Sequence, residues 1–128
     1  MAKILIVDDN PDVLQVMQLI FTSRDFEVAT TTKGEETTGL VNTFNPSLIF
    51  LDINLGSVDG RDISRQLKSA EETKHIPIIL FSANVFKESM LHESLADDFV
   101  AKPFDVTDLL VKVNRLIGST DNAESITA

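Results

Sequence analysis

The chain of 128 residues has no cysteine, tryptophan or tyrosine, and its basic residues are few. The absence of cysteine excludes disulfides, thiolate metal ligands and cysteine nucleophiles. Eleven Lys and Arg stand against 20 Asp and Glu, for a net charge of −9. This balance argues against direct binding to nucleic acid or to anionic membranes, because both need a basic footprint. No apolar run approaches the ~20 residues that span a bilayer, and none resembles a signal peptide, so we expect a cytoplasmic protein.

Apolar residues form short continuous runs at 4–7, 48–51 and 78–81, a weaker run at 99–101 and an alternating segment at 26–30. Such runs are typical of strands in a parallel sheet that is buried on both faces. Between the runs, apolar residues recur at helical spacing. The positions expected to share a helix face are Val13, Met17, Ile20 and Phe21; Leu40 and Phe44; Ile63, Leu67 and Ala70; Phe86, Met90 and Leu91; and Val106, Leu110, Val113 and Ile117. Five βα units in a row predict a doubly wound α/β fold with a five-stranded parallel sheet.

Turn and capping residues agree with this layout. Asn10-Pro11 is typical of a helix N-cap followed by proline at the first helical position. Asn45-Pro46 is expected to end the second helix and Gly118 the last one. Residues 119–128 are polar and lack periodicity, so we expect one domain over residues 1–118 and a polar C-terminal tail over 119–128.

Several chemically active side chains stand where the predicted strands end. Asp8 and Asp9 follow the first strand, Asp52 ends the third, Ser82 ends the fourth and Lys102 ends the fifth. Taken singly, each has an ordinary explanation, such as a helix cap, a turn hydroxyl or a solvated lysine. In a parallel α/β sheet, however, the carboxyl ends of the strands form the edge where ligands bind. Five such residues at four strand ends therefore indicate a site.

The chemistry of that site follows from its charges. Nearby carboxylates repel one another unless a cation joins them, and oxygen ligands suit magnesium. A carboxylate beside such a metal can attack phosphorus and form an aspartyl phosphate. A lysine and a hydroxyl directed at the phosphoryl oxygens would balance the developing charge.

Over about residues 3–118 the chain resembles a response-regulator receiver domain of two-component signalling, in particular a single-domain chemotaxis regulator. The motifs that carry the resemblance are Ile4-Leu5-Ile6-Val7-Asp8-Asp9-Asn10-Pro11, Leu48-Ile49-Phe50-Leu51-Asp52-Ile53-Asn54-Leu55, Val58-Asp59-Gly60, Ile78-Ile79-Leu80-Phe81-Ser82-Ala83 and Phe99-Val100-Ala101-Lys102-Pro103. The resemblance implies strand order 2-1-3-4-5. It also implies a signalling phosphoacceptor that catalyses only its own phosphorylation and dephosphorylation.

The same resemblance assigns roles around the acceptor. Asp52 is implied as the phosphoacceptor, with a sensor histidine kinase or a histidine phosphotransfer protein as donor. Mg²⁺ is implied to bind Asp9, Asp52 and the backbone carbonyl of Asn54 directly, and Asp8 largely through water.

Further roles concern the phosphoryl group and the response to it. Ser82 is implied to bond the phosphoryl group, Lys102 to pair with it, and the Lys102-Pro103 peptide to be cis. Ser82 and Phe99 are the implied switch, and the output face combines the fourth helix, fifth strand and fifth helix. We expect the face bearing Phe99 to carry both of these helices, with contacts drawn from Phe86, Met90, Val111 and Lys112. No output domain follows in this sequence, so we expect output by contact with an unknown protein.

One departure and three rival classes bear on this interpretation. Gly56 stands where family members often have proline, and glycine would leave the loop before the third helix freer.

A haloacid-dehalogenase phosphatase needs an acid at position 54, where this chain has Asn54. A flavodoxin-like carrier needs a phosphate-cradling first loop, but here that loop contains Asp8 and Asp9. A degenerate receiver that only binds partners would lack one of the acids, the hydroxyl or the lysine, and none is missing.

Overall fold

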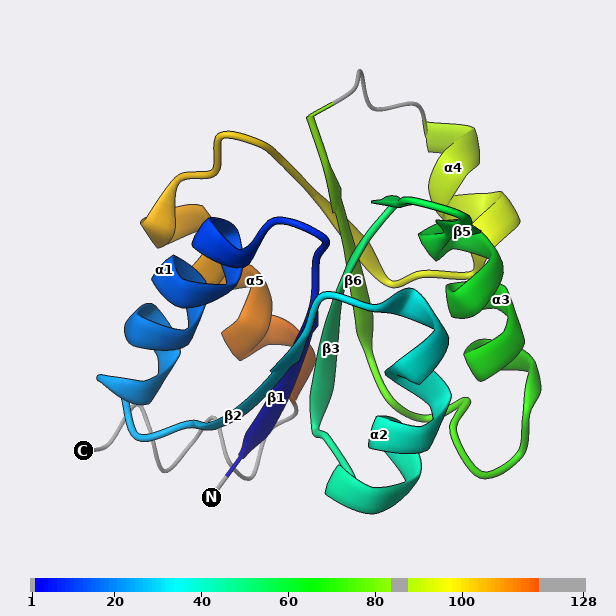
Figure 1. The fold of residues 1–128 in the computed structure, drawn as a ribbon, viewed down its shortest axis with the longest axis horizontal. Coiled ribbons are helices and arrows are strands. Elements are labelled where there is room, and N and C mark those ends of the chain that lie inside the picture. Colours follow the sequence, from blue (N-terminus) through cyan, green and yellow to red (C-terminus); the bar gives the residue numbers. More distant parts are fainter. Residues whose placement is uncertain (1, 84–87, 118–128) are drawn as a thin grey trace.

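The computed structural model describes residues 2–83 and 88–117. Its elements alternate between strands and helices along the chain (Figure 1). In order they are β1 (Lys3–Val7), α1 (Pro11–Thr22), β2 (Glu27–Thr31), a 3-10 turn (Gly34–Glu36), α2 (Thr37–Phe44), β3 (Leu48–Asp52), β4 (Asn54–Leu55), β5 (Val58–Asp59), α3 (Gly60–Ser69), β6 (Ile78–Ser82), α4 (Glu88–Ser94), β7 (Asp98–Ala101) and α5 (Val106–Ile117).

The five long strands form one parallel sheet in the order β2-β1-β3-β6-β7. Counted among the parallel strands alone, this is the predicted order 2-1-3-4-5. The central strands β3 and β6 are buried along their whole length, which explains why their sequences are apolar up to their last residues, Asp52 and Ser82. All carboxyl ends therefore meet at one edge of the sheet.

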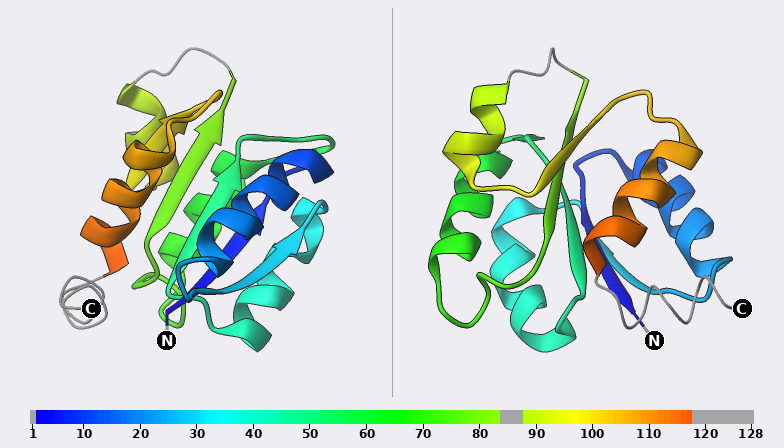
Figure 2. Two further views of the ribbon diagram at one scale, coloured as in Figure 1. Left: turned by 90° about the vertical axis from the view of Figure 1, so that its left-hand side faces the viewer. Right: turned by 180° about the vertical axis from the view of Figure 1, so that it is seen from behind.

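Helices cover both faces of the sheet (Figures 1 and 2). Helices α1 and α5 lie side by side on one face, and α2, α3 and α4 cover the other. Each face has its own core, because side chains alternate between the faces along every strand. The α1/α5 layer packs Met17, Phe21 and Val113 on Phe50 and Phe81. The layer of α2, α3 and α4 packs Val41, Ile63 and Leu67 on alternate residues of the same strands.

The helix ends confirm the capping predictions. The Asn10 side chain accepts a hydrogen bond from the Asp12 N–H, and Pro11 is the first residue of α1. Asn45 ends α2 in the left-handed conformation at φ 53°, which asparagine adopts more readily than most residues. Gly118, Phe86 and the tail over 119–128 lie outside the described residues, and the domain limits of 1–118 and 119–128 stay a prediction.

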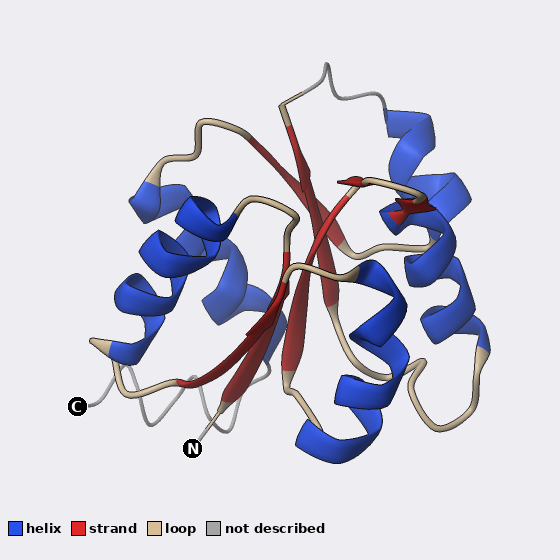
Figure 3. Ribbon diagram, in the orientation of Figure 1, coloured by secondary structure: helices blue, strands red, loops and turns tan. Residues whose placement is uncertain are grey.

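The structure corrects two expectations. Val106 was expected to face the core, but it is exposed; α5 buries Val113, as expected, together with Leu109. The segment after β3 is not a free loop: β4 and β5 pair as a two-stranded antiparallel hairpin (Figure 3). Gly56 lies in its turn at φ 74°, a conformation closed to proline, whose φ is fixed near −65°.

Within the described residues, no helix has the length and apolar character needed to cross a membrane.

Candidate functional site

Three charged side chains converge at the carboxyl edge of the sheet because of strand alternation. Asp8 continues the side of Ile6, Asp52 the side of Phe50, and Lys102 the side of Val100, all of which belong to the α1/α5 layer. Asp8 is completely buried and Asp52 is 3% exposed. The structure therefore brings together the acids and the lysine that the sequence places at separate strand ends.

Lys102 lies between the two buried carboxylates. Its Nζ is 2.7 Å from Asp8 Oδ2 and 3.3 Å from Asp52 Oδ2. The neighbouring strand β6 fixes the backbone of Lys102, because the Lys102 N–H donates to the Ser82 carbonyl at 2.9 Å. The Lys102-Pro103 peptide is cis, as expected. The ammonium is thus the counter-charge of the acidic pair within the protein itself.

The acids also form a set that fits a divalent metal. One carboxylate oxygen from each of Asp8, Asp9 and Asp52 lies within 4.8 Å of the others. Asp8 Oδ2 is buried and accepts no hydrogen bond of good geometry in the described part of the chain, although it is ion-paired with Lys102. An all-oxygen set with two buried members and one exposed member suits Mg²⁺, which keeps several of its waters.

The environment of Asp52 raises the pKa of its carboxyl group from 3.8 to about 6. Burial is the main cause, and the neighbouring charge of Asp8 adds to it. The Asn54 N–H, which donates to Asp52 Oδ1 at 3.2 Å, and the ammonium of Lys102 act in the opposite direction. Near pH 7 the carboxylate form still predominates, so Asp52 is available as a nucleophile.

The hairpin after β3 holds the end of that strand, at Asp52, in place. The Gly60 N–H donates to the Ile53 carbonyl at 2.8 Å. A Cβ atom at Gly60 would lie 1.9 Å from the carbonyl oxygen of Asp52, so no larger residue fits there without movement of that backbone. This contact gives a physical reason for the Val58-Asp59-Gly60 motif, which the sequence alone did not explain.

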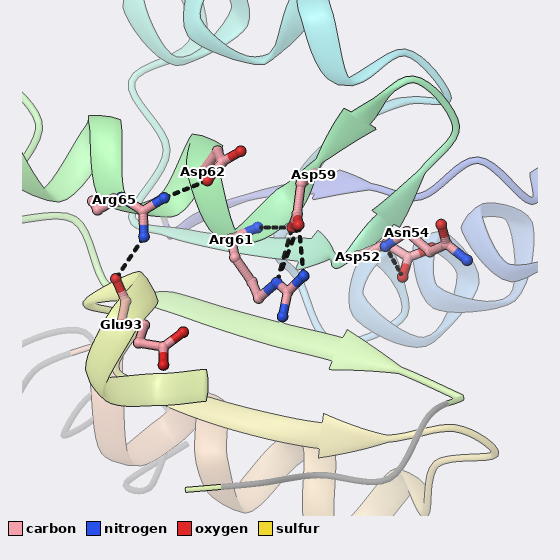
Figure 4. Close-up of polar contacts among 7 residues, drawn as sticks. All are labelled: Asp52, Asn54, Asp59, Arg61, Asp62, Arg65 and Glu93. Carbon is pink, nitrogen blue, oxygen red and sulfur yellow. Dashed lines mark hydrogen bonds and ion pairs between the residues drawn. The ribbon is translucent and has the colours of Figure 1, made fainter. Parts of the chain in front are cut away.

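The start of α3 is fixed by a charged cap that Figure 4 shows beside Asp52 and Asn54. Asp59 accepts from the Arg61 N–H at 2.8 Å and pairs with its guanidinium at 2.7 Å. The Arg61 side chain holds the pKa of the Asp59 carboxyl below its usual value. One turn further, Arg65 donates to the Glu93 carbonyl at 2.9 Å and ties α3 to the last turn of α4.

By strand alternation, Ser82 and Phe99 lie on the opposite side of the sheet from Asp8 and Asp52. Ser82 is 2% exposed and continues the side of Leu80, whose partner in register is Phe99. Phe99 is 7% exposed and belongs to the core under α3 and α4. The expectation that its face also carries α5 is wrong, because α5 packs on the other face. Helix α5 reaches the backbone of Phe99 through a 2.8 Å hydrogen bond that Lys112 donates to its carbonyl.

Sequence reasoning missed one neighbour of the site. The Phe81 ring lies under the Lys102 ammonium, 4.8 Å from Nζ to the ring centroid. The alternation of side chains along the strands could have revealed it. Phe81 is paired in register with Asp52 across parallel strands, so both side chains point to the same face.

A doubly wound α/β domain with buried acids and a lysine at its carboxyl edge defines the phosphoacceptor class, and comparison with known proteins agrees. The sequence profile of the response regulator receiver domain matches residues 4–114. The DNA-binding dual master transcriptional regulator RpaA of Synechocystis is 32% identical over 123 residues, covering 94% of this chain and 51% of that protein. The chain spans about half the length of the curated relatives it matches.

Solved structures give the same result. The receiver domain of the sensor histidine kinase PA1611 from Pseudomonas aeruginosa, with a magnesium ion coordinated in its active site cleft, has a TM-score of 0.82 at 27% identity, covering 92% of this chain and 98% of that chain. The chemotaxis protein CheY4 of Vibrio cholerae shares the fold, with a TM-score of 0.84 at 24% identity, covering 91% of this chain and 98% of that chain.

The chain belongs to the response regulator receiver family. It is a phosphoacceptor of two-component signalling rather than a conventional enzyme, and the cluster of Asp8, Asp9 and Asp52 is its magnesium site. Receiver domains of this kind are phosphorylated by histidine kinases.

Proposed function

We propose that Asp52 is the residue that accepts the phosphoryl group, from the phosphohistidine of a sensor histidine kinase or a histidine phosphotransfer protein. The observation that carries this assignment is the burial of its carboxylate at the carboxyl edge, beside Lys102 and in the acidic cluster with Asp8 and Asp9. A carboxylate oxygen of Asp52 forms the bond to phosphorus, the donor's P–N bond breaks, and the released imidazole takes up a proton.

The surrounding residues would divide the remaining tasks. Asp9, Asp52 and the Asn54 carbonyl would hold Mg²⁺ directly, with Asp8 acting through water. The metal supplies charge neutralisation for the acids and the phosphoryl oxygens. Lys102 would leave its partner oxygen on Asp52 and pair with the phosphoryl group, while Ser82 would donate to it.

Output would follow from Ser82 and Phe99. Phosphorylation adds about −1.5 to −2 charge and strong acceptors at the end of β3. We infer that Ser82 moves toward these acceptors, that Phe99 repacks behind it, and that the edge formed by α4, β7 and α5 changes for a protein partner. The output partner, and the cytoplasm as the compartment, stay predictions.

Intact mass spectrometry with magnesium and acetyl phosphate tests the assignment. The wild-type chain should gain one phosphoryl group, and Asp52→Asn, which keeps the shape but removes the nucleophile, should gain none. EDTA should abolish the gain in the wild type. If Asp52→Asn were phosphorylated at the wild-type rate, another residue would be the acceptor.

The switch is tested separately by amide NMR with and without beryllofluoride as a phosphoryl mimic. Ser82→Ala should still be phosphorylated on Asp52 but should show a smaller shift at Phe99. Equal shifts at Phe99 in both proteins would show that the signal does not pass through Ser82.

A further inference from the structure

The ammonium of Lys102 has an aromatic neighbour in addition to its two carboxylates. Its Nζ lies 4.8 Å from the centroid of the Phe81 ring, within the ~6 Å over which a ring face attracts a cation. Phe81 is 1% exposed and the Lys102 side chain 19%. Water therefore screens this contact poorly, and such attractions are strongest when the cation is desolvated.

The Phe81 ring is held firmly in this position. Its residue pairs with Asp52 across the two central strands, and its carbonyl accepts the Ile53 N–H at 3.1 Å. The ring meets Phe50 edge to face, with centroids 6.0 Å apart. A lysine, in contrast, has a flexible stem and three rotatable donors. The ring is therefore the fixed partner and the ammonium the adjustable one.

The ring also differs from the other described contacts of this ammonium. The carboxylates of Asp8 and Asp52 change their charge balance when a metal or a phosphoryl group arrives, so the two ion pairs weaken at the moment of reaction. The quadrupole of Phe81 does not change. It is the contact that persists while Lys102 moves from a carboxylate oxygen to a phosphoryl oxygen.

We propose that Phe81 is a positioning residue that keeps the Lys102 ammonium beside Asp52 through its ring face and thereby speeds phosphorylation. This role rests on the proposed function of Lys102. Phe81 has no metal-ligating or hydrogen-bonding side-chain atom, so in this role it acts through the lysine.

Fluorinated phenylalanines of increasing fluorine number, placed at position 81 alone, test the proposal. They weaken the negative potential of the ring face while nearly keeping its size. The rate of phosphorylation by acetyl phosphate, followed by intact mass, should fall stepwise by about three- to tenfold in total, as expected for a partly desolvated contact. Magnesium affinity should not change, because Lys102 is not a ligand.

The same series at Phe50 is the matched control. That ring lies in the same core cluster and touches Phe81, but no lysine contact is described for it, so the rate should stay constant. A double-mutant cycle adds a second arm: in Lys102→Ala, fluorination at position 81 should have no further effect.

The outcomes separate this proposal from the function it rests on. A flat series at position 81, equal losses at positions 50 and 81, or an undiminished effect in Lys102→Ala would each overturn it, even with Asp52 confirmed as acceptor. If Lys102→Ala were phosphorylated as fast as wild type, the proposed role of Lys102 would fail instead. An NMR readout is independent of phosphorylation: the Lys102 Cε protons should be shifted upfield by the ring, and Phe81→Leu should abolish that shift.

Discussion

The buried charge of Asp52 should make the metal-free protein less stable than its Asp52→Asn variant at pH 8. Burial raises the pKa of this carboxyl from 3.8 to about 6, so the folded chain binds the proton more tightly than the unfolded chain. Ionisation therefore costs folding free energy. The cost is absent below about pH 3.8, grows between pH 3.8 and 6, and is complete above pH 6.

The magnitude follows from the same values. At about 1.4 kcal/mol per pKa unit, the difference between 3.8 and about 6 corresponds to about 3 kcal/mol. Asparagine keeps an oxygen that can accept from the Asn54 N–H, and Lys102 keeps its 2.7 Å partner Asp8. The free energy of unfolding of Asp52→Asn should therefore exceed that of the wild type by up to about 3 kcal/mol at pH 8, and by little near pH 4.

Urea unfolding in EDTA at pH 4, 6 and 8 measures this difference. Far-UV circular dichroism is the suitable probe, because the chain has no tryptophan or tyrosine. Glu35→Gln, which removes a charge from an exposed position, controls for net charge and should show no comparable gain. An Asp52→Asn variant that is no more stable than wild type at pH 8, or whose gain is the same at pH 4, would refute the reasoning.

Three further predictions concern residues near Asp52. Gly60→Ala should lower the free energy of unfolding by about 1–3 kcal/mol, because the new Cβ would overlap the backbone carbonyl of Asp52. Gly39→Ala is the control: it lies in a helix with open space around it and should raise the free energy of unfolding by about 0.5–1 kcal/mol. Urea unfolding midpoints measure both changes. Asp59→Ala should cost about 1 kcal/mol through loss of the α3 cap. Because Arg61 lowers the pKa of Asp59, that cost should be present above about pH 3.8 and disappear below it in the same titration. Asp9→Ala should raise metal-free stability by about 1 kcal/mol and remove most of the stabilisation by magnesium. Thermal melts with and without Mg²⁺ measure both effects. A variant that melts below the wild type without metal, yet is still stabilised by Mg²⁺, would contradict this prediction.

The sheet and the charged edge could be predicted because each signal was local. A buried parallel strand needs a continuous apolar run, and Asp8, Asp52 and Lys102 each follow such a run or end it. The helix ends at Asn10 and Asn45 could be predicted for a similar reason, since caps depend on a few adjacent residues.

Other features depend on contacts distant in sequence and left no local signal. The two-residue strands of the β4–β5 hairpin are too short for any periodicity, and the hairpin is held where Gly60 meets the backbone of Asp52. Helical spacing along α5 was compatible with either Val106 or Leu109 facing inward, and the sheet beneath decides for Leu109. The contact between Phe81 and Lys102 was hidden because every residue of β6 is buried, so its hydrophobicity does not reveal which side it faces.

Phe81 and Ser82 are adjacent in sequence, yet their side chains enter different layers of the molecule. By strand alternation, Asp8, Asp52 and Lys102 continue the side of Ile6, Phe50 and Val100, whereas Ser82 continues the side of Leu80, where Phe99 is also buried. The sheet thus separates the two groups of side chains, and in the proposed switch the end of β3 is where Ser82 would reach the phosphoryl group. Substitutions beneath α3 and α4 can retune what surrounds Phe99 without entering the compartment of the acids. Under the proposed function Ser82 would serve both groups, so the residues around Phe99 could change in evolution while Asp8, Asp52 and Lys102 stay the same.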